Sequence, residues 1–345
     1  MENNTQPKDP NEYYTKVLTL ADLQPGDILT FEGEDHGISS LIMMFTNSKV
    51  THGALFYQNT PVPALADAGQ SGIFAHRVEM KEGARSVYVS RLTKKEGLLK
   101  PDAPFAPDAL SPVLNAAHFY VSEGLKYPYS DLVLLALILI YKDITASGIK
   151  QAIIVTLLEV LAAKIKKLID DKFHDGEHTM VCSSFVYQCY LDASKENKDL
   201  EIQLNRDADL RPGLRQAGVK RSNTLFDLYA EHAAEYNYNT ESFRTLRGSL
   251  TDVSLDSIID EILKQPRENR VTLLKSNELS SAIESLLKTL MELFKMPFKN
   301  IEELIKNAEN LKSMFVTPND LCFNIKNAEK VGRIALDRHD ANLQV

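Results

Sequence analysis

The chain contains few cysteines. Cys182, Cys189 and Cys322 are the three among 345 residues. An odd number at these spacings argues against a disulfide framework, so a reducing compartment is the simpler expectation. The first ten residues also lack the apolar stretch of a secretory signal peptide. We therefore expect a cytoplasmic protein, with signal-independent export as the alternative.

Positive charge is scarce as well. The 39 Lys and Arg residues are outnumbered by 47 Asp and Glu residues, which gives a formal net charge of −8. No basic stripe with interleaved aromatic residues is visible, so we expect no nucleic-acid partner. The content of apolar residues, 44%, and of charged residues, 25%, is ordinary for a soluble globular protein.

Long apolar runs are missing. The most apolar segment, residues 132–140, is followed closely by Lys142 and is too short for a bilayer span, which needs about 20 residues. A second apolar segment covers residues 153–163. We expect 130–172 to form a buried helical hairpin that caps the core. The alternative is an interfacial surface or an acyl-chain tunnel, with peripheral membrane contact.

The remaining pattern predicts an α+β fold, with an antiparallel sheet packed on helices. Strand patterns predominate from residue 18 to about 95 and are interrupted by one helical segment at 37–46. Further helices are expected near 112–125 and 182–195, and residues 224–314 look wholly helical. The predicted strands are 28–31, 50–57, 62–66, 73–79 and 86–91.

Cys182 is the candidate nucleophile. The apolar positions Phe185, Val186 and Cys189 follow it at helical spacing, which puts Cys182 at a helix start. A helix N-terminus carries unsatisfied N–H groups and a partial positive charge, and both stabilise a thiolate. His52 begins a β-branched and aromatic run, so it lies at a strand start and is the candidate base. The alternative for Cys182 is a buried, inert side chain.

Five short segments support this pair, with the histidine before the cysteine. They are LQPGDIL at 23–29, TNSKVTHG at 46–53, ADAGQSGI at 66–73, YPYSD at 127–131 and TPNDL at 317–321. In this order they resemble the circularly permuted NlpC-type papain-like group. That group includes YiiX-like bacterial proteins and lecithin retinol acyltransferase-like enzymes.

The resemblance implies a division of the chain. Residues 18–200 would form a permuted papain-like catalytic core after a disordered tail at 1–17. Family-like sequence resumes at Thr317, so 315–345 would be a closing segment that returns to the core. Residues 224–314 would then be a separable helical insertion whose helices bury one another.

The resemblance also implies a third site residue, Asp67. Its carboxylate would accept the other imidazole N–H of His52 and fix the tautomer. The family commonly has Glu here, and Asp is one methylene shorter. The alternative for Asp67 is a turn residue beside Gly69. His76, two predicted strands after His52, is kept as the backup base.

Two other segments that contain acidic residues could have a functional role. Asp27 follows Pro25-Gly26 and is expected to form a turn. His174 and His178 have the spacing of zinc ligands on a helix, but Gly176 between them indicates a loop. We therefore expect no metal site.

These observations together predict a cysteine-dependent hydrolase or acyltransferase that forms a thioester from an amide or an acyl ester. Its catalytic residues would be Cys182, His52 and Asp67, without a cofactor. The substrate would be a small molecule, a lipid or a peptide. One alternative is a cell-wall peptide amidase, and another is a non-catalytic lipid- or protein-binding module. The sequence does not indicate an oligomeric state.

Overall fold

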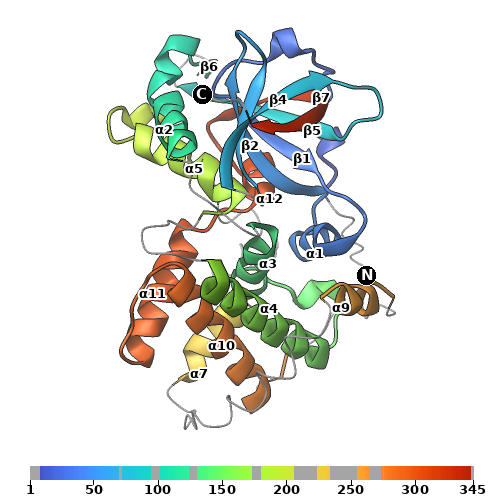
Figure 1. Cartoon of the computed structure of the whole chain (residues 1–345), viewed down its shortest axis with the longest axis vertical. Helices are drawn as coiled ribbons and strands as arrows, with labels where there is room; N and C mark the ends of the chain where they lie inside the picture. Colours follow the sequence, from blue (N-terminus) through green and yellow to red (C-terminus); the bar gives the residue numbers. More distant parts are fainter. Residues whose placement is uncertain are drawn as a thin grey trace.

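A closed antiparallel sheet forms one lobe of the molecule and a group of helices forms the other (Figure 1). The mixed α+β class expected from the sequence is confirmed. The computed structural model describes residues 8–69, 72–94, 102–123, 130–172, 180–205, 224–233, 255–264, 273–274 and 276–342.

The sheet has the strand order β1-β2-β3-β4-β7-β5-β6, with antiparallel neighbours throughout its described strands. Because β1 also pairs with β5, six of these strands close into a ring. The strands are β1 (Ile28–Glu32), β2 (Val50–Gln58), β3 (Ala64–Gly69), β4 (Gly72–Met80), β5 (Ser86–Lys94), β6 (Ala103–Pro104) and β7 (Ala328–Asn342).

The first five strands lie where the sequence predicts them. β7 does not have a predicted counterpart, since we expected 315–345 only to return to the core. It lies between β4 and β5 and pairs with both, so it completes the ring. These partners come from a distant part of the chain, and local sequence does not reveal such pairing.

Side chains alternate between the inner and outer faces of this ring. On the inner face, Leu29, Ala54 and Leu65 belong to one apolar cluster. Asp67 pairs directly with Ala54, and His52 is two residues before Ala54, so both share the inner face. The start of β2 and the end of β3 therefore bring a histidine and an acid to the same end of the sheet.

Two helices cover the outer face near β2 and β3. They are α2 (Ser111–Ser122) and α5 (Cys182–Ala193), and they share an apolar cluster with that face (Figure 1). Gly53 allows a close approach here. A Cβ at Gly53 would lie 3.2 Å from Cδ1 of Leu321 and 3.5 Å from Cα of Ser183. The missing side chain therefore lets the start of α5 lie directly against β2.

The helical lobe has one continuous apolar core. Two of its helices begin at residues that commonly cap helix N-termini. Ser276 accepts a hydrogen bond from the backbone N–H of Leu279, and Asn300 accepts one from the backbone N–H of Glu303. The helices are α1 (Gly37–Thr46), α3 (Ser130–Tyr141), α4 (Gln151–Lys172), α7 (Leu225–His232), α9 (Leu255–Lys264), α10 (Asn277–Leu293) and α11 (Ile301–Met314).

The packing of α10 bears on the expected insertion at 224–314. α10 contacts α11 and α7, as helices of one bundle would, but it also packs along α4 and touches α3. The hairpin 130–172 and the helices of 224–314 therefore share a core, because the broad apolar faces of α4 and α10 bury each other.

Candidate functional site

Cys182 is the first residue of α5, as its sequence context predicts. Val181 stands at the N-cap position and makes no side-chain cap. The N–H groups of the first helical turn have no partner within the helix. Cys182 is fully buried, and it belongs to the apolar cluster of the helical lobe, whereas Phe185 and Cys189 of the same helix pack against the sheet. The thiol thus lies where the two lobes meet.

His52 and Asp67 form a short hydrogen bond. Nε2 of His52 lies 2.7 Å from Oδ2 of Asp67, and the Asp67 side chain is completely buried while that of His52 is 17% exposed. The ring of Phe31 stands edge-on to the imidazole, with centroids 5.7 Å apart, and so holds it from the neighbouring strand. The shorter reach of Asp compared with Glu is therefore sufficient at this position.

Cys182 affects the pKa of His52 through its charge and through a side-chain contact, which places the thiol beside the imidazole. Since Nε2 is engaged by Asp67, Nδ1 is the ring nitrogen left for the thiol. Burial lowers the pKa of His52, but the negative charge of a Cys182 thiolate, the hydrogen bond to Asp67 and the contact with Cys182 raise it more, to about 10. The three residues expected to act together thus lie next to one another, with a hydrogen bond between His52 and Asp67.

The other cysteines have different surroundings. Burial raises the pKa of Cys189 well above its usual value, and the nearby charge of Asp192 adds to this effect. Burial likewise raises the pKa of Cys322 to about 11. All three cysteines are fully buried, so exposure does not distinguish them. What distinguishes Cys182 is its histidine partner.

His76 lies on the far side of Asp67. Nε2 of His76 is 3.2 Å from Oδ1 of Asp67, in a contact that is longer and less well aligned than the bond from His52. His52, and not His76, takes the position beside Cys182. The backup assignment of His76 as the base therefore has no geometric support.

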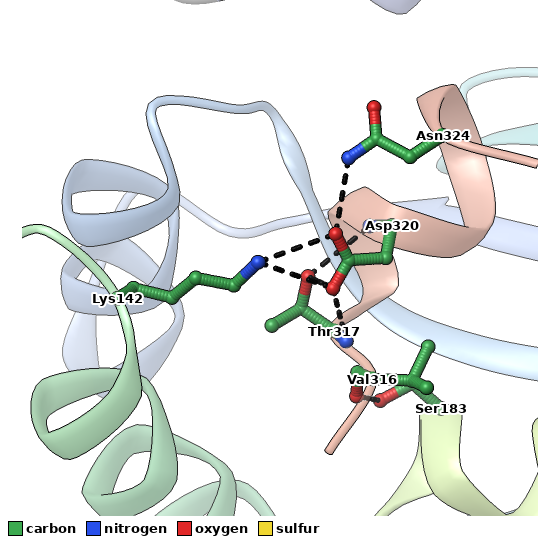
Figure 2. Close-up of polar contacts among 6 residues, drawn as sticks. All are labelled: Lys142, Ser183, Val316, Thr317, Asp320 and Asn324. Carbon is green, nitrogen blue, oxygen red and sulfur yellow. Dashed lines mark hydrogen bonds and ion pairs between the residues drawn. The ribbon is translucent and has the colours of Figure 1, made fainter. Parts of the chain in front are cut away.

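The closing segment supports the start of α5 (Figure 2). The hydroxyl of Ser183, the residue after Cys182, donates a 2.6 Å hydrogen bond to the carbonyl of Val316. Thr317 and Asp320 then form a reciprocal cap at the start of α12 (Pro318–Phe323). The conformation of the closing segment thus fixes one neighbour of the thiol.

Asp320 links this segment to the helical lobe. Nζ of Lys142, the residue after α3, donates to both carboxylate oxygens at 3.2 Å, and the side-chain amide of Asn324 donates at 3.0 Å. Figure 2 shows both residues directed at Asp320. Burial would raise the pKa of Asp320, but Lys142 and the hydrogen bonds from Thr317 and Asn324 lower it below its usual value. The sequence singled out the segment 317–321 but not its partner Lys142, because Lys142 lies far away in the chain.

The remaining sequence candidates fall elsewhere. His174 and His178 lie outside the described residues, as does most of the segment 127–131. Among the residues that the structure describes, no group of His, Cys, Asp and Glu side chains could hold a metal ion. Asp27 accepts a hydrogen bond from the Gln24 backbone, as a turn residue would, and it also forms a buried ion pair with Arg91 at 2.7 Å.

Comparison of the chain with family models, with curated proteins and with solved structures gives no match. Within the described part of the chain, none of the helices combines the length and the apolar character needed to cross a membrane.

Proposed function

We propose that the protein is a thiol-dependent hydrolase or acyltransferase of the permuted papain-like type, with Cys182 as nucleophile, His52 as base and Asp67 as the residue that orients His52. The observation that carries this proposal is the Cys182 thiol at the start of a helix, beside an imidazole that a buried carboxylate holds through a 2.7 Å hydrogen bond. A structural cysteine has no need of an imidazole held by a buried carboxylate.

The chemistry follows from these positions. The thiolate of Cys182 attacks a carbonyl carbon, and the resulting oxyanion accepts hydrogen bonds from N–H groups of the first turn of α5. The imidazolium of His52 gives its proton to the leaving amine or alcohol, which departs and leaves a thioester. His52 then takes a proton from water or from another acceptor, which attacks the thioester, releases the acyl group and restores the thiolate. Asp67 stabilises the imidazolium at each stage.

The surroundings of the thiol favour an acyl ester over a peptide amide. Cys182 and Val181 are part of the apolar cluster that includes Leu134, Leu157 and Leu286 of the helical lobe. An acyl chain that enters beside the thiol would meet apolar side chains rather than the polar groups that recognise a peptide. A lipid acyl group is therefore the substrate class that we propose, with a cell-wall peptide amide as the second candidate.

Alkylation tests the reactive thiol directly. Brief treatment with iodoacetamide near pH 6, followed by peptide mapping, should label Cys182 well before Cys189 and Cys322. Because all three are equally buried, the comparison reports on chemical surroundings rather than on exposure. His52→Ala should remove the preference. Equal labelling of the three cysteines in the parent protein would contradict the proposal.

Turnover tests the reaction. p-Nitrophenyl esters of short and long acyl chains, and matched peptide p-nitroanilides, should separate ester from amide substrates, and intact mass should detect a thioester adduct that hydroxylamine removes. Cys182→Ala should abolish adduct and turnover, whereas Cys189→Ala, on the same helix, is the matched control. A parent protein that labels selectively but never forms an adduct would instead support a binding module.

A further inference from the structure

The carboxylate of Asp67 lies between two histidines. Oδ2 accepts a hydrogen bond at 2.7 Å from Nε2 of His52, whereas Oδ1 lies 3.2 Å from Nε2 of His76 in an ion-pair contact whose alignment falls short of a hydrogen bond. The side chain of Asp67 is completely buried and that of His76 is 9% exposed. Only His52 takes part in the proposed reaction, so the contact between His76 and Asp67 needs another explanation.

The strand register explains how the three side chains meet. His52, Asp67 and His76 come from the adjacent strands β2, β3 and β4, on the inner face of the ring. Asp67 pairs with Ala54 on one side and with Phe74 on the other, and His76 pairs with Leu65. Because neighbouring strands are antiparallel, His52 lies toward Gly69 and His76 toward Leu65. The three side chains thus form a diagonal line, with Asp67 in the middle.

The chemistry of His76 selects one tautomer. A carboxylate oxygen can only accept, so Nε2 of His76 must carry the hydrogen when it faces Oδ1 of Asp67. Nδ1 of His76 is buried and has no hydrogen-bond partner. A buried N–H without an acceptor is costly, so a lone pair at Nδ1 suits this position better than a hydrogen. The surroundings therefore favour the tautomer that donates toward Asp67.

We infer that His76 is a positioning residue, which donates from Nε2 to Oδ1 of Asp67 and thereby keeps Oδ2 in line with His52. This inference rests on the proposed function. The terminal torsion of a carboxylate has a broad energy well, so the side chain of Asp67 can rotate about it. A second donor on the other oxygen restricts that rotation. His76 itself does not touch the thiol or the substrate.

The test compares two substitutions of His76 by the rate at which iodoacetamide labels Cys182. Glutamine places an amide nitrogen near the position of Nε2 and keeps a donor, whereas methionine fills similar space without one. We expect His76→Met to lower the labelling rate about tenfold, the effect of losing one hydrogen bond to a charged group, and His76→Gln to stay within about threefold of the parent.

A double-mutant cycle separates positioning from a structural role. If His76 acts through Asp67, His76→Met should have little further effect when Asp67 is already asparagine. The cycle also needs the rate of Cys182 labelling in Asp67→Asn alone. Thermal melting of each variant shows whether it is folded. Additive losses, or equal losses in His76→Gln and His76→Met, would overturn the positioning role.

The outcome also distinguishes this inference from the proposed function. If the parent protein labels Cys182 selectively and His76→Met labels at the same rate, His76 has no positioning role, and the Cys182–His52–Asp67 proposal stands. If the parent protein shows no selective labelling of Cys182, both are overturned. Full rescue by glutamine with loss by methionine supports both.

Discussion

Replacement of Asp67 by asparagine isolates the charge that stabilises His52. The substitution keeps the shape of the side chain and an oxygen that can accept the hydrogen bond now measured at 2.7 Å. It removes the negative charge from a position with no solvent exposure. Any change in the titration of His52 therefore reports the electrostatic role of Asp67.

The structure sets the size of the effect. The pKa of His52 is raised from 6.5 to about 10, a rise worth about 5 kcal/mol at 1.36 kcal/mol per pKa unit. Both Cys182 and Asp67 raise it, each through charge and through a side-chain contact. Loss of a hydrogen bond to a charged group is worth about 1.5–3 kcal/mol, which corresponds to roughly a tenfold to hundredfold change in rate.

The sign of the pH effect follows from linkage. A histidine whose pKa is raised on folding stabilises the native state fully below its unfolded pKa of 6.5, and this contribution is lost as the pH rises through about 10. In Asp67→Asn the pKa of His52 should fall, so the imidazolium and its stabilising contribution should disappear at a lower pH. Turnover should fall by less than in His52→Ala.

Histidine-selective NMR gives the measurement. Protein labelled with ¹³C at histidine Cε1, titrated from pH 5 to 10, should show the His52 resonance moving at lower pH in Asp67→Asn than in the parent, with His52→Gln identifying the signal. Labelling of Cys182 by iodoacetamide over the same range gives a second readout. Asp67 lies inside β3 and is paired on both sides, so it is not the turn residue that the sequence left as an alternative. An unchanged titration of His52 together with unchanged labelling would refute the role of Asp67 beside His52.

Two further predictions concern the junction between the lobes. Asp320→Asn should destabilise the protein by about 2–4 kcal/mol in chemical denaturation, because it leaves Lys142 partly buried without its charge partner; the double variant with Lys142→Met should recover part of this loss. The stabilisation by Asp320 should be present above its unfolded pKa of 3.8 and be lost as the pH falls through its lowered folded pKa. Equal stability of Asp320→Asn and the parent at pH 7 would contradict this role of Asp320. Replacement of 224–314 by a Gly/Ser linker should expose the apolar face of α4 that α10 covers, and the protein should therefore aggregate. Soluble protein with a reactive Cys182 would instead support the separable insertion expected from the sequence.

Local patterns in the sequence determined much of the molecule. The helical spacing after Cys182 placed it at the start of α5, and the β-branched run after His52 placed that residue at the start of β2. α1 was predicted with its observed bounds, since its four apolar positions share one face and no competing strand pattern overlaps them. Such features depend on neighbours within one or two turns, which is why sequence alone reveals them.

Only the tertiary structure decided what surrounds these elements. β7 closes the ring by pairing with strands more than 200 residues away in the chain, and no local pattern encodes that choice. Within 224–314, α10 packs on α4 of the hairpin, because an apolar stripe specifies burial but not what covers it. The register of β2, β3 and β4 places His76 on the side of Asp67 that faces away from His52. The sequence supplied the candidate nucleophile, base and acid. The closed sheet brought His52 and Asp67 together, and the packing of α5 on β2 placed Cys182 beside His52.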